Sequence, residues 1–472
     1  MGRNITKHVK FKKYWNLIIF LILDLIQVVI LSSIDIKESG TDSNSLIGFD
    51  INIAINIYLT LLYLSAIYLL RAILSFLSVR RMFQRPDLLQ IYPAVSALEK
   101  IPIGKFTSNE ICNWINEIAE DSGIRKVSKI YLARTSIPNA FTIDLTPIPF
   151  FYKNTSVVFN SNLATVLNEE EIKAVIAHEL GHIKNSDSFL RLILSAPHLF
   201  LQMAYIFAYA RIILGVATAL LYFFDVFLLI IRLLVLMVVF IISSFVSDLT
   251  ISFLKKSNKM AELMADEQSL AVMGPNVTIN MLIKLGQRLE VLQTLKKELI
   301  WLESRNIYQE KIKRRFIISI LENFSDYEID DQKARTDAPA IYLEKVLDIL
   351  RKQYFLDLTD IPEVEERLIK ASNQLASERK IILERKKHLK DNKKKNLEQV
   401  ERVDWRKYDL DKDYSLSEKE IAEFIIHLKN NPLSLFESEG YEEEESSHPS
   451  FRSRILFVAY KSNFKEILFS NS

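Results

Sequence analysis

Residues 171–187, EIKAVIAHELGHIKNSD, contain the stretch HELGH, in which His178 and His182 stand four positions apart. On an α-helix, residues at this spacing lie on one face, so the two imidazoles point the same way and can hold one metal ion. Glu179 follows the first histidine, and its carboxylate can reach a water molecule bound to that metal. The pattern H-E-x-x-H is typical of zinc metalloproteases and predicts a Zn²⁺ site.

The helix that carries this pattern is predicted on other grounds as well. A compact, largely apolar run from Ala174 to Gly181 follows the polar Asn168. Residues 169–171 are all glutamate, and negative charge suits the N-terminus of a helix dipole. The alternative is a helix whose histidines are only surface or core polar groups.

A catalytic zinc usually takes three protein ligands and a water, so two histidines leave the site incomplete. A second helical run, KKSNKMAELMADEQSLAVMG at residues 255–274, carries Glu262 and, four positions later, Asp266. We expect Glu262 to be the third ligand and Asp266 to hydrogen-bond the outer nitrogen of a ligating histidine. Such a pair alone is usually two solvated charges, but the HELGH stretch favours the functional interpretation.

The composition indicates a helix-rich membrane protein. With the HELGH stretch and the mixed pattern of residues 86–187, the predicted fold class is a mostly α membrane protein with a small α+β, zincin-like metallopeptidase domain. The chain has 472 residues, of which 49% are hydrophobic, and it contains 10 glycines. Its net charge of +2 gives no electrostatic case for nucleic-acid binding. The one cysteine, Cys112, excludes a disulfide framework within the chain.

Two apolar segments near the N-terminus predict membrane spans. Residues 14–34 have the length of a bilayer crossing, with a cleaved signal peptide as the alternative, and Asp24 and Gln27 within them should face other helices. A second apolar run covers about residues 51–79. Basic residues flank the outer ends of both runs and are nearly absent between them, which places residues 1–13 and 80 onward in the cytosol.

Residues 188–254 are again mostly apolar, and two further crossings bring the total to about four transmembrane helices. An even number of crossings is needed because the histidines and Glu262 must meet at one metal. The predicted division of the chain is an anchor with two spans at 1–85, the first half of the peptidase domain at 86–187, two spans at 188–254, the second half of the peptidase domain at 255–290, a charged helical insertion at 291–431, and a C-terminal part of the peptidase domain at 432–472.

The first half of the peptidase domain mixes helix and strand patterns. SNEICNWINEIAED at residues 108–121 predicts a helix. Strands are predicted from the segments KVSKIYLAR at 126–134, AFTID at 140–144 and SVVFN at 156–160.

Four motifs in this order resemble those of the HtpX family of membrane zinc endopeptidases, which is related to the CAAX prenyl protease family. They are HELGHIKNSD, similar to HExxHxxNxD; AELMAD, similar to ExxAD; IPNAF, similar to the PNAF edge strand; and SHPSFRSRI, similar to HPxxxxRI. The resemblance covers about residues 14–290 and 432–456 and leaves the role of most of the insertion open. It implies Glu262 as the third ligand. The first motif also includes Asn185 and Asp187, and the resemblance implies that Asn185 supports the ligands. It also implies that the edge strand lays out the substrate backbone with Asn139, Ala140 and Phe141.

The residues and the resemblance together predict a membrane-anchored zinc endopeptidase at the cytosolic face of the bilayer, in a bacterial inner membrane. Glu179 takes a proton from the zinc-bound water and passes it to the leaving amine, and His448 or Arg454 stabilises the oxyanion. The expected partners are the lipid bilayer and polypeptide substrates, namely membrane or misfolded proteins in quality control. The alternatives are a CAAX-type protease acting on lipidated tails and an inactive membrane scaffold.

The insertion contains a second pattern, WRKYDLDKDYSLSEKEIAEF at residues 405–424. Its acidic and hydroxyl side chains stand at positions 1, 3, 5, 7, 9 and 12 of a calcium-binding EF-hand loop. These residues are Asp409, Asp411, Asp413, Ser415, Ser417 and Glu420. Tyr414 stands where such a loop normally needs glycine. The two alternatives are a weak Ca²⁺ site and an acidic turn in which Ser417 caps a helix that begins near Glu418.

Overall fold

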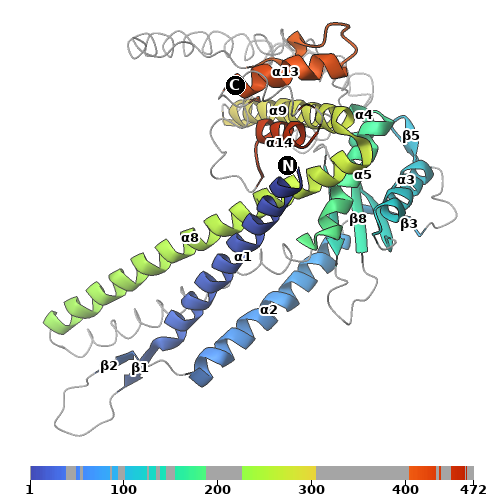
Figure 1. Ribbon diagram of the computed structural model, residues 1–472. Coiled ribbons are helices and arrows are strands. Elements are labelled where there is room, and N and C mark those ends of the chain that lie inside the picture. The colour runs from blue at the N-terminus through green and yellow to red at the C-terminus, as the bar shows by residue number, and fades with distance from the viewer. Residues whose placement is uncertain are drawn as a thin grey trace, which may run out of the picture.

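The computed structural model describes residues 2–38, 49–53, 57–84, 88–93, 101–124, 127–133, 139–144, 155–187, 226–304, 403–431, 435–436, 448–462 and 464. A sheet and several packed helices form a globular part, and three long helices, α1 (Gly2–Ser33), α2 (Ile57–Phe83) and α8 (Val226–Met273), extend from it (Figure 1). Helix α1 lies between α2 and α8 and contacts both.

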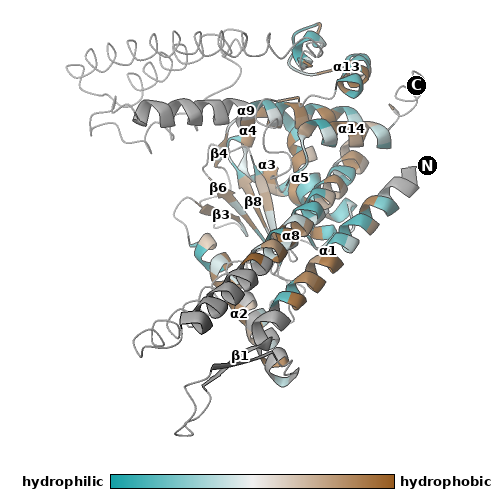
Figure 2. Cartoon of the chain, turned by 90° about the vertical axis from the view of Figure 1, so that its left-hand side faces the viewer, coloured by the Kyte–Doolittle hydropathy of each residue, from teal (hydrophilic) through white to brown (hydrophobic). Residues whose placement is uncertain are grey.

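The sheet has four strands in the order β3 (Leu88–Tyr92), β6 (Lys129–Ala133), β8 (Thr155–Asn160) and β7 (Ala140–Asp144). Strands β6 and β8 are parallel, whereas both outer pairs are antiparallel, and β7 forms one edge. The strands are largely hydrophobic because the sheet is packed against helices (Figure 2). Strands β6, β7 and β8 confirm the three predicted strands, whereas β3 was not predicted.

Two helices beside the sheet begin at sequence signals that satisfy the free amides of a first turn. Helix α3 (Ser108–Asp121) starts with a capping box between Thr107 and Glu110, and its bounds confirm the predicted helix. Helix α5 (Glu169–Lys184) starts with a second box between Asn168 and Glu171. Each box satisfies amides that have no partner within the helix and so fixes where its helix starts.

One hydrophobic core joins the sheet to helices from the far end of the sequence. Phe159 of β8 and Ile172 of α5 are fully buried in the same cluster as Ile283, Phe424 and Ile455. The last three belong to α9 (Pro275–Ser304), α13 (Glu418–Asn430) and α14 (Phe451–Lys461). The C-terminal helices therefore fold back on the peptidase unit and can place side chains at its site.

The polar residues of the first predicted span face other helices, as expected. The Tyr68 hydroxyl of α2 donates to Asp24 Oδ2 at 2.9 Å, and Gln27 Nε2 donates to Thr250 Oγ1 of α8 at 2.7 Å. Asp24 and Gln27 are buried, while apolar neighbours on α1 such as Ile22 are exposed. Among the parts of the chain that the structure describes, no helix combines the length and the apolar character that a membrane crossing requires.

Two sequence boundaries differ from the structure. Residues 34–38 and 49–53 form an antiparallel pair, β1 (Ile34–Glu38) and β2 (Phe49–Ile53), so the start of the second apolar run belongs to a strand and α2 begins only at Ile57. Helix α8 runs without a break across the boundary predicted at 254/255. The region of the third predicted span, 188–225, and most of the insertion lie outside the described residues, so the count of four spans stays a prediction.

Candidate metal centre

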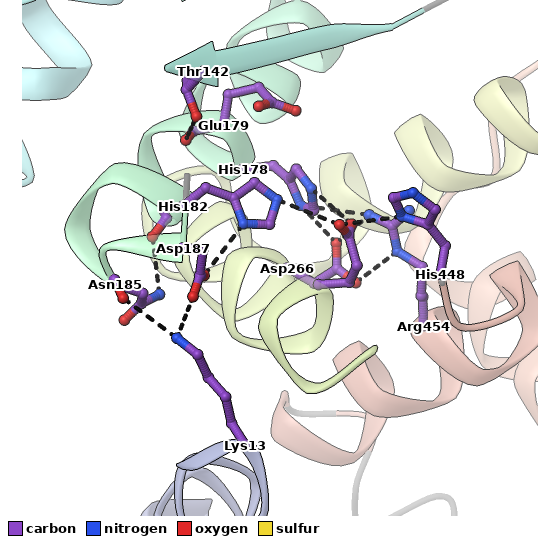
Figure 3. Close-up of polar contacts among 12 residues, drawn as sticks. Lys13, Thr142, His178, Glu179, His182, Asn185, Asp187, Asp266, His448 and Arg454 are labelled. Carbon is purple, nitrogen blue, oxygen red and sulfur yellow. Dashed lines mark hydrogen bonds and ion pairs between the residues drawn. The ribbon is translucent and has the colours of Figure 1, made fainter. Parts of the chain in front are cut away.

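Helix α5 places His178, Glu179 and His182 inside the protein. All three residues are buried, with exposed fractions of 7%, 7% and 4%. One potential ligand atom from each lies within 4.8 Å of the others. In Figure 3 the Glu179 side chain lies beside Thr142 of β7, whose hydroxyl donates to the Glu179 carbonyl at 3.4 Å. Glu179 is therefore positioned at the edge of the sheet.

Helix α8 brings Glu262 opposite the two histidines. Its Oε2 lies 3.4 Å from His178 Nε2, and its Oε1 lies 3.6 Å from His182 Nε2. Zinc ligands at about 2.0–2.2 Å in a tetrahedral arrangement lie about 3.4 Å apart. The three side chains thus fit a zinc ion, with both Nε2 atoms and the Glu262 carboxylate as its ligand atoms.

The outer nitrogen of each histidine meets a buried aspartate. His178 Nδ1 lies 2.9 Å from Asp266 Oδ1, and His182 Nδ1 lies 3.3 Å from Asp187 Oδ2. An aspartate at Nδ1 holds the ring in place and leaves Nε2 directed at the metal position. Sequence reasoning expected this contact for Asp266 but gave no role to Asp187, which follows the end of α5.

Two buried cations complete these contacts (Figure 3). Arg454 of α14 forms a two-pronged bond with Asp266, from Nε to Oδ2 at 2.8 Å and from Nη2 to Oδ1 at 2.6 Å. Lys13 of α1 donates to Asp187 Oδ1 and, at 3.3 Å, to the Asn185 carbonyl. Each histidine thus contacts an aspartate, and that aspartate in turn binds a basic side chain. The two basic side chains come from opposite ends of the sequence.

The electrostatics of the centre favour a cation between the histidines and Glu262. Burial lowers the pKa of His178, but hydrogen bonds to Asp266 and Glu262 outweigh burial and raise that pKa to about 9. Burial raises the pKa of Asp266, but the charge and hydrogen bonds of Arg454 outweigh it, and the pKa lies below its ordinary value. The Asp266 and Glu262 carboxylates therefore stabilise positive charge at the His178 ring.

The absence of a side chain at Gly181 allows α8 to approach α5. A Cβ there would lie 2.9 Å from Gln268 Cβ, closer than real Cβ atoms come, and 3.0 Å from Ala265 Cα, which is tighter than most real contacts. The Ser269 hydroxyl also donates to the Ala174 carbonyl at 3.0 Å and links the two helices. The glycine inside HELGH thus determines the separation between the histidines and Glu262.

The structure separates the two candidates for stabilising an oxyanion. Both strong bonds of Arg454 go to Asp266, and Arg454 Nη2 lies 3.4 Å from His178 Nδ1, behind the ring and away from Nε2. The His448 side chain is 58% exposed, and its Nδ1 lies 3.2 Å from Glu262 Oε1. Of the two side chains, His448 is the more exposed, and it lies beside the proposed ligand Glu262.

Asn185 does not support a histidine. It is the C-terminal cap of α5, and its Nδ2 donates to the Gly181 carbonyl at 2.9 Å. The last carbonyls of a helix lack intrahelical partners, and the asparagine satisfies one of them. The predicted supporting role is thus filled by Asp187, two residues further on.

The predicted substrate strand is the edge strand beside α5. Ala140 and Phe141 are the first residues of β7 and pair with Phe159 and Val158 of β8. The Asn139 carbonyl accepts from the Asn160 amide at 3.1 Å. Only one side of β7 pairs with another described strand, which is the arrangement that an added substrate strand needs.

The EF-hand-like loop lies elsewhere, before α13. The carboxylates of Asp409, Asp411 and Asp413 lie within 4.8 Å of one another and accept hydrogen bonds from loop amides. Tyr414 adopts a φ of 65°, the left-handed conformation for which a calcium loop normally uses glycine. Ser417 is the N-cap residue of α13, which begins at the predicted Glu418, and its amide and hydroxyl both donate to Glu420 at 2.8 Å. Calcium binding here stays a prediction.

A buried histidine pair facing a glutamate, with a second glutamate beside a sheet edge, defines a metallopeptidase. The chain belongs to peptidase family M48, whose family model matches residues 106–461. This membership confirms the predicted class, a metalloendopeptidase of the HtpX type.

Individual relatives match only a short part of the chain. A "Protease HtpX homolog" of Sulfurihydrogenibium sp. is 35% identical over 97 residues, which cover 19% of this chain and 31% of the relative. One from Persephonella marina is 43% identical over 75 residues, covering 16% and 24%. "Protease HtpX" of Legionella pneumophila is 34% identical over 95 residues, covering 20% and 30%. Less than a third of each of these relatives is therefore covered. No solved structure matches.

Proposed function

We propose that this protein is a membrane-anchored, zinc-dependent endopeptidase that cleaves membrane or misfolded polypeptides at the cytosolic face, in quality control. One observation carries the proposal: His178 Nε2 and His182 Nε2 face opposite oxygens of Glu262 at 3.4 and 3.6 Å, with Glu179 buried beside them. These separations match a tetrahedral zinc site with room for a water. The resemblance to HtpX proteases supports the substrate class.

The surrounding residues supply the remaining steps of the reaction. A bound Zn²⁺ lowers the pKa of its water and polarises the scissile carbonyl. Glu179 accepts the proton of the attacking water and passes it to the leaving amine. His448, exposed beside Glu262, donates to the oxyanion in this proposal, because the Nε and Nη2 donors of Arg454 bind Asp266.

Strand β7 holds the substrate in this proposal. An extended peptide added at the edge of β7 that pairs with no other described strand would run past Thr142, whose side chain contacts the backbone of Glu179. Main-chain hydrogen bonds at a sheet edge bind a peptide largely regardless of its sequence. This mode of binding suits an enzyme whose substrates are many different unfolded chains.

Chelation should separate this enzyme from an inactive scaffold. We expect the full-length protein, purified in detergent, to cleave an unfolded casein substrate, to lose activity with a zinc chelator and to regain it when zinc is added back, because the water is activated only at the metal. Peptide release measured over time tests this. Activity that survives removal of all bound metal would contradict the proposal.

The membrane topology has its own test. The support is the pattern of apolar segments with basic residues at their cytosolic ends. After replacement of Cys112, a cysteine at the exposed Lys256 of α8 should resist an impermeant maleimide in intact cells and react after permeabilisation. A cysteine at Ser45, between the first two predicted spans, is the matched control and should react from outside. Labelling of position 256 in intact cells would refute the cytosolic placement.

A further inference from the structure

The two proposed histidine ligands are supported in the same way. His178 contacts Asp266, which binds Arg454. In the same way, His182 contacts Asp187, which binds Lys13 (Figure 3). Arg454 stands in the HPxxxxRI-like motif, whereas Lys13 lies in the N-terminal helix, 174 residues from its aspartate. No motif of the sequence marks Lys13, so its place at the metal centre emerges only from the fold.

Burial gives the contact of Lys13 with Asp187 more weight than a surface ion pair. The side chains of both residues are 2% exposed. A buried carboxylate needs a partner for its charge and for each oxygen, and here Lys13 takes Oδ1 while His182 Nδ1 faces Oδ2. Because the two partners occupy different oxygens, the ammonium fixes the rotation of the carboxylate, which in turn fixes the imidazole.

Lys13 is itself held in a fixed position. Ser257 of α8 donates to the Lys13 carbonyl at 3.2 Å. One turn earlier, Val9 packs against Met264 of α8 and Phe457 of α14 in a small buried cluster. This end of α1 is therefore packed into the peptidase unit, and it delivers the ammonium from a rigid support.

We infer that Lys13 is a positioning residue of the metal centre, acting on His182 through Asp187; the inference rests on the proposed zinc peptidase function. The N-terminal helix is then part of the site as well as an anchor. Outer partners of metal-bound histidines typically contribute about 10–100-fold to metal affinity. We expect Lys13→Met to weaken zinc binding by a factor in this range.

The test measures metal binding as well as activity. Full-length wild type, Lys13→Met and the matched control Lys12→Met, an exposed lysine of the same helix, are titrated with zinc against a fluorescent chelator. The visible spectrum of each protein loaded with Co²⁺ reports the geometry around the ion. We expect weaker zinc binding and an altered Co²⁺ spectrum for Lys13→Met, and wild-type behaviour for Lys12→Met.

A double-mutant cycle shows whether Lys13 acts through Asp187. Asp187→Asn should weaken zinc binding, and adding Lys13→Met to it should cause no further loss. Lys13→Met alone could fail to fold because it leaves the Asp187 carboxylate buried without a cation. The double variant has no such carboxylate, so comparing its zinc affinity with that of Asp187→Asn still tests the inference. Wild-type zinc affinity in Lys13→Met, or an undiminished further loss on the Asp187→Asn background, would overturn the inference while leaving the zinc peptidase intact. A wild type that binds no zinc would instead overturn both.

Discussion

Glu179→Gln is expected to lower the rate of peptide hydrolysis by about 10²–10⁴-fold while the protein keeps its full zinc content. Glutamine has nearly the same shape as glutamate but cannot accept the proton of the attacking water. The proposed ligands, His178, His182 and Glu262, are untouched. Turnover of an unfolded substrate and zinc content per chain are measured on the same purified sample.

The control for this variant is Glu170→Gln on the same helix, whose side chain is 56% exposed and forms a surface ion pair with Lys173. It should behave as wild type. Loss of zinc from Glu179→Gln would show that Glu179 is a ligand, which its position within 4.8 Å of both histidines makes a real alternative. Near-normal hydrolysis by the zinc-loaded variant would remove Glu179 from the mechanism altogether.

Glu262→Ala is expected to weaken zinc binding by more than about 100-fold, beyond the loss caused by removing an outer partner of a ligand. It deletes the carboxylate that faces both Nε2 atoms and leaves two histidines, too few for a catalytic zinc site. Hydrolysis at limiting zinc should be lost as well. Zinc content after gel filtration and competition with a chelator measure the effect.

Asp248→Asn, an exposed acidic position on the same helix, is the matched control and should bind zinc as wild type does. Unchanged zinc stoichiometry in Glu262→Ala would show that another group completes the ligand set. The two variants together distinguish a metal ligand from a proton acceptor. Glu262→Ala is expected to lose the zinc, whereas Glu179→Gln is expected to keep it and lose activity.

Local features of the site were predictable from the sequence because their signals lie within a few residues. The start of α5 at Asn168, its capping box and the i, i+4 spacing of the histidines all follow from adjacent residues. The strands β6, β7 and β8 followed from β-branched and aromatic runs. The missed strand β3, LLQIY, had only a short apolar run as its signal.

The parts that sequence reasoning missed depend on distant contacts. Asp187 reaches His182 because α5 ends before Ser186, whose backbone adopts a φ of 55°. A positive φ at serine has no strong sequence signal. The sequence therefore pointed to Asn185, and not to Asp187, as the residue that supports a histidine. Lys13 meets Asp187 only after α1 has packed along α8, and no spacing rule spans that separation in sequence.

The distribution of the centre over the sequence sets an order of assembly during translation. Lys13 leaves the ribosome first, the histidine pair follows, Glu262 comes later, and His448 and Arg454 come near the end of the chain. A nascent chain that stops before residue 448 carries all three proposed ligands, but Asp266 lacks the guanidinium that it binds in the finished protein. A complete centre therefore exists only once synthesis has passed Arg454, so an unfinished chain carries an incomplete hydrolytic site.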